Sequence, residues 1–212
     1  MRIGELSRRT GISVPTIKYY VREGLLPAGQ LTSPNQASYD ESHEARIRLI
    51  RALLEVGGLS VAAIREVMTA IDDRERPVHK VLGAAADRLV PRYDQDPGAG
   101  VIEARQVVAE LVGRRGWRAE AGGGPAGEAL AVALAALDEV GHGTFAELLD
   151  TYAEAAEEVA RADLGYVTRG GVAREELVEA AVVGTVLGDA VFAALRRMAH
   201  VDASGRAFGE GV

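Results

Sequence analysis

Residues 12–27, which read ISVPTIKYYVREGLLP, constrain the fold more than any other stretch of the chain. Ser13 can cap a helix with its hydroxyl, Pro15 is tolerated in a first turn, and Gly24 can end the helix. A shorter helical pattern over residues 3–9 precedes this stretch, with a glycine in the link between them. The pattern predicts two short helices joined by a tight turn.

The second of these helices has two different sides. At 100° per residue, the apolar side chains at positions 14, 17 and 21 fall on one side, and Lys18, Tyr19 and Arg22 fall on the other. A short helix that exposes two cations and an aromatic ring suits the major groove of DNA. We therefore interpret the segment as a helix-turn-helix. The alternative is an ordinary helical hairpin with solvated charges.

Three motifs in order carry a family resemblance. They are IGELSRRTGISVPTIKYYVREGLLP, the pair Tyr39-Asp40, and LLEVGGLSVAAIREV. Together they resemble the winged-helix DNA-binding domain of the MerR family of bacterial transcription regulators, over about residues 1–72. The resemblance implies a DNA reader in which Lys18 occupies a position usually held by arginine, and Tyr19 and Tyr20 match a pair of aromatics.

The candidate DNA-binding residues lie in the first two helices, the wing and the third helix. They are Arg8, Arg9, Ser13, Thr16, Lys18, Tyr19, Tyr20, Arg22, Gln36 and Arg46. We expect Lys18 and Tyr19 to contact the groove, and the arginines at 8, 9 and 22 to contact phosphates or to be solvated charges. Tyr20 lies at the edge of the apolar side, so it is equally suited to packing.

The wing departs from the pattern of the resembled family. That pattern commonly reads asparagine-glycine, tyrosine, arginine near Asn35, whereas this chain has Gln36, Ala37 and Ser38 after it. The usual wing arginine is absent, and Gln36 could donate only a weaker, neutral hydrogen bond. Arg46 on the third helix is a candidate to compensate.

The charge of the chain is distributed unevenly. The formal net charge is −7, yet residues 1–22 hold five basic side chains against one acidic side chain. Residues 81–212 hold 12 arginines and 21 acidic side chains. Because salt screens charges beyond roughly 10 Å, a basic head on an acidic body can still bind phosphates.

Composition excludes several classes of site. The chain has no cysteine, so it can form no disulfide, thiolate metal site or cysteine-held iron–sulfur cluster. The four histidines show no ligand spacing, although a histidine-carboxylate metal site stays open. We expect no cofactor and no membrane partner. The charged, amphipathic N-terminus does not resemble a signal peptide, so we expect a cytoplasmic protein.

The fold class predicted is all-α with a small wing hairpin. A wing is expected over residues 25–39, a third helix from an Asp40 cap to Val56, and a fourth from a Ser60 cap. Further helices are expected over residues 78–93, 101–115, 127–140, 145–163 and 174–199. The predicted domains are a head (1–72), a linker with a dimerisation helix (73–100), an all-helical domain (101–203) and a frayed tail (204–212).

The C-terminal half carries no catalytic constellation, so we expect no enzyme activity. Its aromatic residues and one carboxylate set among apolar neighbours are candidates for a small-molecule site. These candidates are Trp117, Tyr152, Tyr166, Asp189 and Phe192. The alternative is that the aromatics form the core of a domain poor in such residues, and that the carboxylate is paired or lies at a domain edge.

The resemblance implies a homodimer on a two-fold symmetric promoter operator, in double-stranded DNA whose promoter elements are spaced too far apart. A small organic effector would change the DNA so that RNA polymerase, an indirect partner, engages both elements. One rival is a ligand-independent dimeric repressor whose second domain only dimerises or recruits a partner. The other is an interaction protein with a degenerate DNA-binding head.

Overall fold

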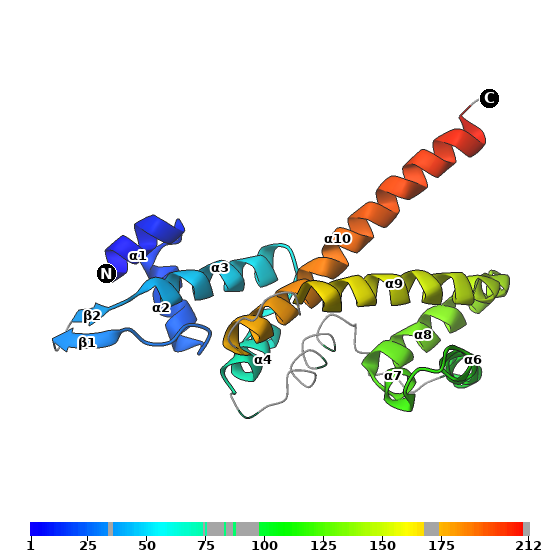
Figure 1. The fold of residues 1–212 in the computed structure, drawn as a ribbon, viewed down its shortest axis with the longest axis horizontal. Helices are drawn as coiled ribbons and strands as arrows, with labels where there is room; N and C mark the ends of the chain where they lie inside the picture. Colours follow the sequence, from blue (N-terminus) through cyan, green and yellow to red (C-terminus); the bar gives the residue numbers. More distant parts are fainter. Residues whose placement is uncertain are drawn as a thin grey trace. The chain divides into compact units, whose positions relative to one another are not determined.

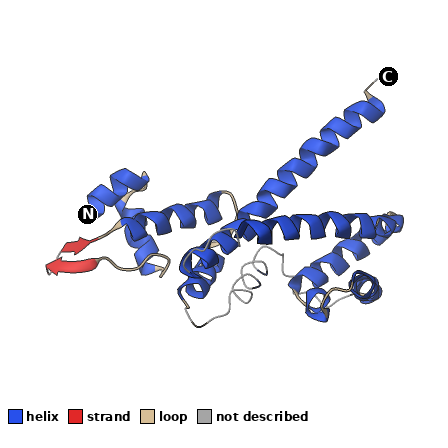
Figure 2. Ribbon diagram, in the orientation of Figure 1, coloured by secondary structure: helices blue, strands red, loops and turns tan. Residues whose placement is uncertain are grey.

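The computed structural model describes residues 1–33, 36–73, 98–167 and 174–209, together with the single positions 75, 83 and 87. The described chain is helical apart from one two-stranded hairpin (Figure 2). It divides into two compact units, residues 1–85 with 172–212, and residues 86–171. Among the described helices, none combines the length and apolar character that a membrane span requires.

The first unit begins with the two predicted short helices (Figure 1). Helix α1 spans Ile3–Thr10 and ends at Gly11, whose φ of 72° is the left-handed conformation that glycine tolerates. Helix α2 spans Val14–Arg22, and Gly24 follows it with the same φ. The sequence-based prediction of a helix-turn-helix is confirmed in its helices and its turn.

A short antiparallel hairpin follows α2. Strands β1 (Gln30–Ser33) and β2 (Gln36–Ser38) pair with a register shift after Leu31. The hairpin is tied to the N-terminus by a bridge between Arg2 and Ser38, and the Tyr39 amide donates to the Met1 carbonyl at 2.8 Å. Tyr39 is buried.

Helices α3 (Glu41–Glu55) and α4 (Val61–Asp72) begin at the predicted caps. The Asp40 carboxylate accepts from the amides of Ser42 and His43, and the Ser60 hydroxyl accepts from the amide of Ala63. The hydrogen bonds from Ser42 and then His43 hold the pKa of Asp40 well below its usual range. These caps set the first residues of α3, directly after the wing, and of α4.

The core of this unit is formed by fully buried aliphatic side chains from α1 to α4 and the segment after α2. They include Leu6, Ile17, Leu25, Leu26, Ile47, Ile50, Leu53, Ile64 and Met68. Helix α10 (Arg174–Phe208) belongs to the same unit, because Val182 and Val186 are buried and the helix contacts α3 and α4. The expected domain over residues 101–203 thus divides between the two units.

The second unit is all-helical. It comprises α6 (Ala99–Arg115), α7 (Ala119–Gly123), α8 (Pro125–Glu139), the 3₁₀ helix η1 (Gly143–Leu148) and α9 (Leu149–Val167). Its core is built from small and aliphatic residues, among them Ala104, Val108, Leu111, Ala131 and Leu134. Arg105 clamps Glu128 with two hydrogen bonds of 2.7 and 2.8 Å, which fixes α6 against α8.

Several predicted boundaries differ from those observed. Helix α7 was not predicted, and residues 143–148 form a 3₁₀ turn where an α-helix was expected from residue 145. The frayed tail is wrong in part, because α10 continues to Phe208 and Arg206 pairs with Asp202 at 2.6 Å, one turn away. The helix predicted over residues 78–93 lies outside the described residues, except for positions 83 and 87, which are helical.

Candidate DNA-binding surface

An N-terminal cap and a buried side determine which side chains of α2 face solvent. The Ser13 hydroxyl accepts from the Thr16 amide at 3.2 Å and lies 2.8 Å from the Thr16 hydroxyl. Ile17 and Tyr20 face the core, so Lys18 and Arg22 are held in solvent on the opposite side. The capping and burial therefore fix which side chains the helix can offer to a partner.

Exposed Lys18 and Arg22 and half-buried Tyr19 lie on one side of the helix, which we call the α2 face. The guanidinium carbon of Arg22 lies 5.3 Å from the centroid of the Tyr19 ring, in the range of a cation–π contact. Lys18 is exposed and makes no hydrogen bond or ion pair within the described part of the chain. An uncompensated ammonium beside a flat aromatic and a guanidinium can contact both base edges and phosphates.

The predicted phosphate contacts on α1 differ from each other. Arg8 is exposed and has no ion pair to any described residue. The Nε atom of Arg9 instead lies 2.9 Å from Glu44, a buried carboxylate on α3 that also accepts from Arg48 at 2.8 Å. The Arg9 side chain is still 46% exposed, so it can contact a phosphate as well. Its ion pair with Glu44 also connects α1 to α3.

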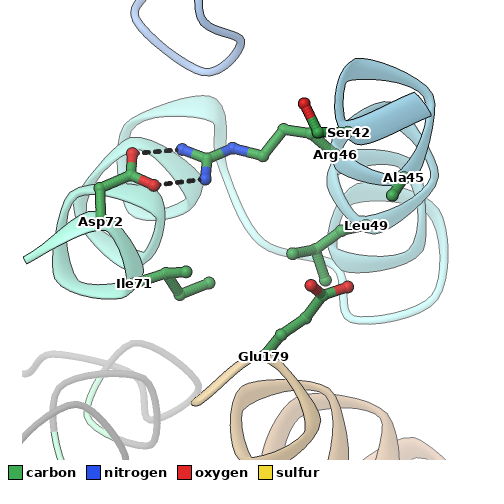
Figure 3. Close-up of a pocket in the computed structure, with 7 residues that line it drawn as sticks. All are labelled: Ser42, Ala45, Arg46, Leu49, Ile71, Asp72 and Glu179. Carbon is green, nitrogen blue, oxygen red and sulfur yellow. Dashed lines mark hydrogen bonds and ion pairs between the residues drawn. The ribbon is translucent and has the colours of Figure 1, made fainter. Parts of the chain in front are cut away.

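Arg46 is engaged inside the head (Figure 3). Its Nε donates to the Leu25 carbonyl at 3.0 Å, and its terminal nitrogens each donate to Asp72 at 2.6 Å. The side chain is only 13% exposed. This geometry joins α3, α4 and the segment after α2, and it favours a structural role over the DNA contact expected from the sequence. Tyr20 is also buried, and this burial raises its pKa.

The wing presents few charges. Gln36 is exposed on β2, and the Thr32 hydroxyl donates to its carbonyl at 3.2 Å. Sequence reasoning did not single out Arg2, which is exposed and whose backbone bridges to Ser38 of the wing. The bridge places this cation at the base of the wing, and only the pairing of the N-terminus with β2 reveals it.

The candidate ligand residues lie in different places. In the second unit, the Trp117 indole donates to Glu157 at 2.9 Å and packs on the core, while the rings of Tyr152 and Phe145 are 5.7 Å apart. Tyr166 is exposed on α9. Two further candidates, at positions 189 and 192, are exposed on α10 in the first unit.

Two cavities are lined by other residues. A cavity of about 340 Å³ lies between α3, α4 and α10 and is bounded by the Arg46–Asp72 pair, Leu49, Ile71 and Glu179 (Figure 3). A cavity of about 210 Å³ lies between α6, α8 and η1. Within the described ranges, no group of three or more histidine or carboxylate side chains is placed to hold a metal ion.

Comparisons with known proteins agree with this geometry. The family profile described as MerR HTH family regulatory protein matches residues 1–71. The HTH-type transcriptional regulator ZntR homolog of Haemophilus influenzae is 42% identical over 97 residues, which cover 45% of this chain and 72% of that protein. The nodulation protein NolA of Bradyrhizobium elkanii is 42% identical over 67 residues, and the match spans 32% of this chain but only 30% of NolA.

One solved structure matches the whole chain. It is SCO5550 from Streptomyces coelicolor A3(2), a protein assigned as a transcriptional regulator, with 37% identity, a TM-score of 0.73 and full coverage of both chains. The family profile covers the head, which carries the α2 face. On these grounds the chain belongs to the MerR family of DNA-binding transcription regulators.

Proposed function

We propose that this regulator binds a two-fold symmetric promoter operator as a homodimer, with α2 of each protomer in the major groove. The observation that carries the proposal is the α2 face, in which Lys18 has no hydrogen bond or ion pair to any described residue and Tyr19 and Arg22 lie beside it. A helix of nine residues with this arrangement fits the groove and can reach base edges.

Phosphate contacts would surround the α2 face. Arg8 on α1 and Arg2 at the base of the wing are exposed cations on the same head, and Gln36 offers a neutral donor. Ser13 and Thr16, at the N-terminus of α2, lie where a helix end can meet a phosphate. We do not include Arg46 or Tyr20 in the proposed contact set, because both side chains are used within the head.

The test is an affinity measurement on selected DNA. An operator would be selected from random duplexes with the full-length protein, and binding followed by fluorescence anisotropy. Lys18→Ala should weaken binding roughly tenfold or more and relax discrimination between sequences, because a good base contact is worth about 1–3 kcal/mol. Arg118→Ala in the second unit is the matched control, since it removes one exposed positive charge far along the chain from α2. Equal affinities for the two variants would refute the assignment of α2.

We further propose that a small organic effector controls this regulator. The cavity between α3, α4 and α10 supports a ligand, because its volume of about 340 Å³ falls in the range of small-molecule sites. Leu49 and Ile71 supply apolar walls, and Glu179 supplies a carboxylate beside the mutually neutralised Arg46–Asp72 pair, so an organic cation is the preferred class. The ligand residues expected from the sequence stay predictions: Trp117, Tyr152 and Tyr166 in the second unit, and Asp189 and Phe192 on α10 in the first.

Control requires an energetic difference between two states. An effector shifts the regulator only if it binds them with different affinities, and smooth bending of the operator costs about 1–6 kcal/mol. The cavity lies between the helix pair of the head and α10, so a ligand there could change how the head is held. The twisted or shortened promoter DNA would then be engaged by RNA polymerase, as the family resemblance implies.

The alternative is a ligand-independent dimeric repressor. It is favoured by Trp117, a predicted ligand residue whose indole is already bound to Glu157. Non-denaturing mass spectrometry of the purified protein separates the two. A dimer that carries additional small-molecule mass, lost in a Glu179→Gln, Asp72→Asn variant, supports the effector proposal. A dimer of bare mass whose operator affinity is unchanged by a panel of organic amines supports the repressor.

A further inference from the structure

An arginine on α4 holds the residue that directly follows α2. The Nε atom of Arg65 donates to the Glu23 carbonyl at 2.7 Å, and a terminal nitrogen of the same side chain donates to the Glu23 carboxylate at 2.5 Å. The two residues are 42 positions apart in the chain. We call this arrangement the Glu23–Arg65 clamp. It connects α4 to the C-terminal end of the helix that we assign to the major groove.

The packing of each helix explains why the two partners meet. The Glu23 amide still donates to the Tyr19 carbonyl at 2.9 Å, but the Glu23 carbonyl lies past the last hydrogen bond within the helix. A cation at this end of a helix is favoured by the helix dipole. On α4, Ile64 and Met68 are fully buried, and Arg65 between them is at the surface with 45% of its side chain exposed.

The Glu23 carboxylate also lies next to Arg22 on the α2 face. The Nε atom of Arg22 is 3.7 Å from Oε1 of Glu23, which is longer than a hydrogen bond, and the Arg22 side chain is 73% exposed. Arg65 holds the other oxygen, Oε2, at hydrogen-bond distance. Two arginines therefore share one carboxylate, and Arg65 makes the closer contact.

The division of this carboxylate affects how much positive charge α2 presents. An ion pair within the protein reduces the attraction of an arginine for phosphate. A guanidinium has a fixed fork of donors, and Arg65 uses this fork on the carbonyl and the carboxylate of one residue. Without Arg65, both oxygens of Glu23 would be open to Arg22, and the charge of Arg22 would be neutralised.

We propose that Arg65 is a positioning residue for DNA binding, because the clamp keeps Glu23 from pairing with Arg22 and leaves Arg22 available to a phosphate. The inference rests on the proposed placement of α2 in the major groove. Arg65 would act through Glu23 and Arg22 rather than by touching DNA. The competing explanation is a direct phosphate contact by Arg65, whose side chain is partly exposed.

A double-mutant cycle separates the two explanations. Operator affinity of the full-length protein would be measured by fluorescence anisotropy across a salt series. Arg65→Met should weaken binding roughly tenfold and lower the salt slope by about 0.9, the effect of losing one phosphate contact. In a Glu23→Gln background, which lacks the competing charge, the same substitution should cost less than about threefold. An equal loss in both backgrounds would show a direct phosphate contact and overturn the proposal.

Glu23→Gln alone should bind the operator at least as tightly as the wild type, because it removes a negative charge beside the α2 face. Arg65→Lys supplies another readout. Lysine keeps the charge that a phosphate contact needs but lacks the fork that spans the carbonyl and the carboxylate of Glu23. We therefore expect Arg65→Lys to bind nearly as weakly as Arg65→Met, and wild-type affinity for this variant would refute the clamp.

Arg105→Met is the matched control for the loss of charge. The Arg105 side chain is also 45% exposed, and it donates two hydrogen bonds to Glu128 in the second unit. This variant should bind the operator as the wild type does. A loss as large as that of Arg65→Met would assign the effect to net charge and overturn the proposal.

Failure of the clamp can be distinguished from failure of the proposed function. Circular dichroism would establish that each variant is folded, and if Arg65→Met does not fold, Arg65→Lys in both backgrounds provides the same comparison. If Lys18→Ala weakens operator binding and Arg65→Met does not, the clamp is refuted while the assignment of α2 stands. If neither substitution changes the affinity, both are refuted.

Discussion

Replacement of Arg46 by methionine should destabilise the DNA-binding head without removing a DNA contact. The substitution keeps an aliphatic side chain of similar length but removes the guanidinium. The Leu25 carbonyl loses a charge-assisted hydrogen bond of 3.0 Å, which contributes about 1.5–3 kcal/mol. Asp72 is 57% exposed and can be rehydrated, so its share is about 0–1 kcal/mol. We expect a loss of about 2 kcal/mol.

Urea denaturation followed by circular dichroism measures the total loss, and hydrogen exchange of peptides from α3 and α4 locates it. Arg51→Met is the matched control, because Arg51 lies on the same helix and pairs with Glu55, an exposed residue one turn away. That control should leave the unfolding free energy within measurement error. Asp72→Asn, which removes only the exposed end of the network, should cost clearly less than Arg46→Met.

Two results would refute this reasoning. If Arg46→Met costs no more than Arg51→Met, the contact with Leu25 does not stabilise the head. If Arg46→Met instead lowers operator affinity with unchanged stability, Arg46 is the phosphate contact that the sequence suggested. Operator affinity must be measured well below the denaturation midpoint, so that only folded protein is compared.

Three other substitutions test the wing, the second unit and the packing of α10 against the α3–α4 loop. Arg2→Ala should weaken operator binding and reduce the dependence of affinity on salt by about one phosphate, with unchanged stability, as anisotropy across a salt series would show. Glu157 has a lowered pKa because Arg115 and then the tryptophan indole donate to it. The stabilisation is therefore complete above about pH 4.3, the unfolded value, and is lost as pH falls through the lower folded pKa. Glu157→Gln should reduce stability at pH 7, and its difference from the wild type should shrink as the pH falls below about 4.3, measured by fluorescence of the single tryptophan. Gly57→Ala should cost about 1–3 kcal/mol in thermal or urea unfolding, because the new methyl overlaps Val186; a neutral effect would refute that packing.

The features that could be predicted from the sequence are those that depend on neighbours along the chain. Ser13, Asp40 and Ser60 were expected to cap helices, and each accepts an amide hydrogen bond two or three residues later. Gly11 and Gly24 end or follow helices in the left-handed conformation. A cap or a turn is decided within one helical turn, so the local sequence contains the whole interaction.

The second unit was less predictable because its sequence is rich in alanine and glycine. Alanine promotes helix but gives weak directional information, since it can lie on either a buried or an exposed side. Helix α7 spans only Ala119–Gly123, and a short element of this kind gives no periodic pattern. The same ambiguity hid the extension of α10, in which Ser204 and Gly205 suggested an end but the helix continues to Phe208.

The DNA-binding surface shows why the sequence identifies cations more easily than it identifies free cations. Arg8 and Arg9 are adjacent in the chain, yet only Arg9 meets Glu44, 35 positions later. Arg46 is neutralised by Asp72, which is 26 positions away. Phosphate attraction depends on the charges that remain unpaired near the DNA, since an ion pair within the protein reduces the local positive potential. The positive charge of residues 1–22 is therefore an upper bound on what the head offers to DNA, and Lys18 matters more than its single charge suggests.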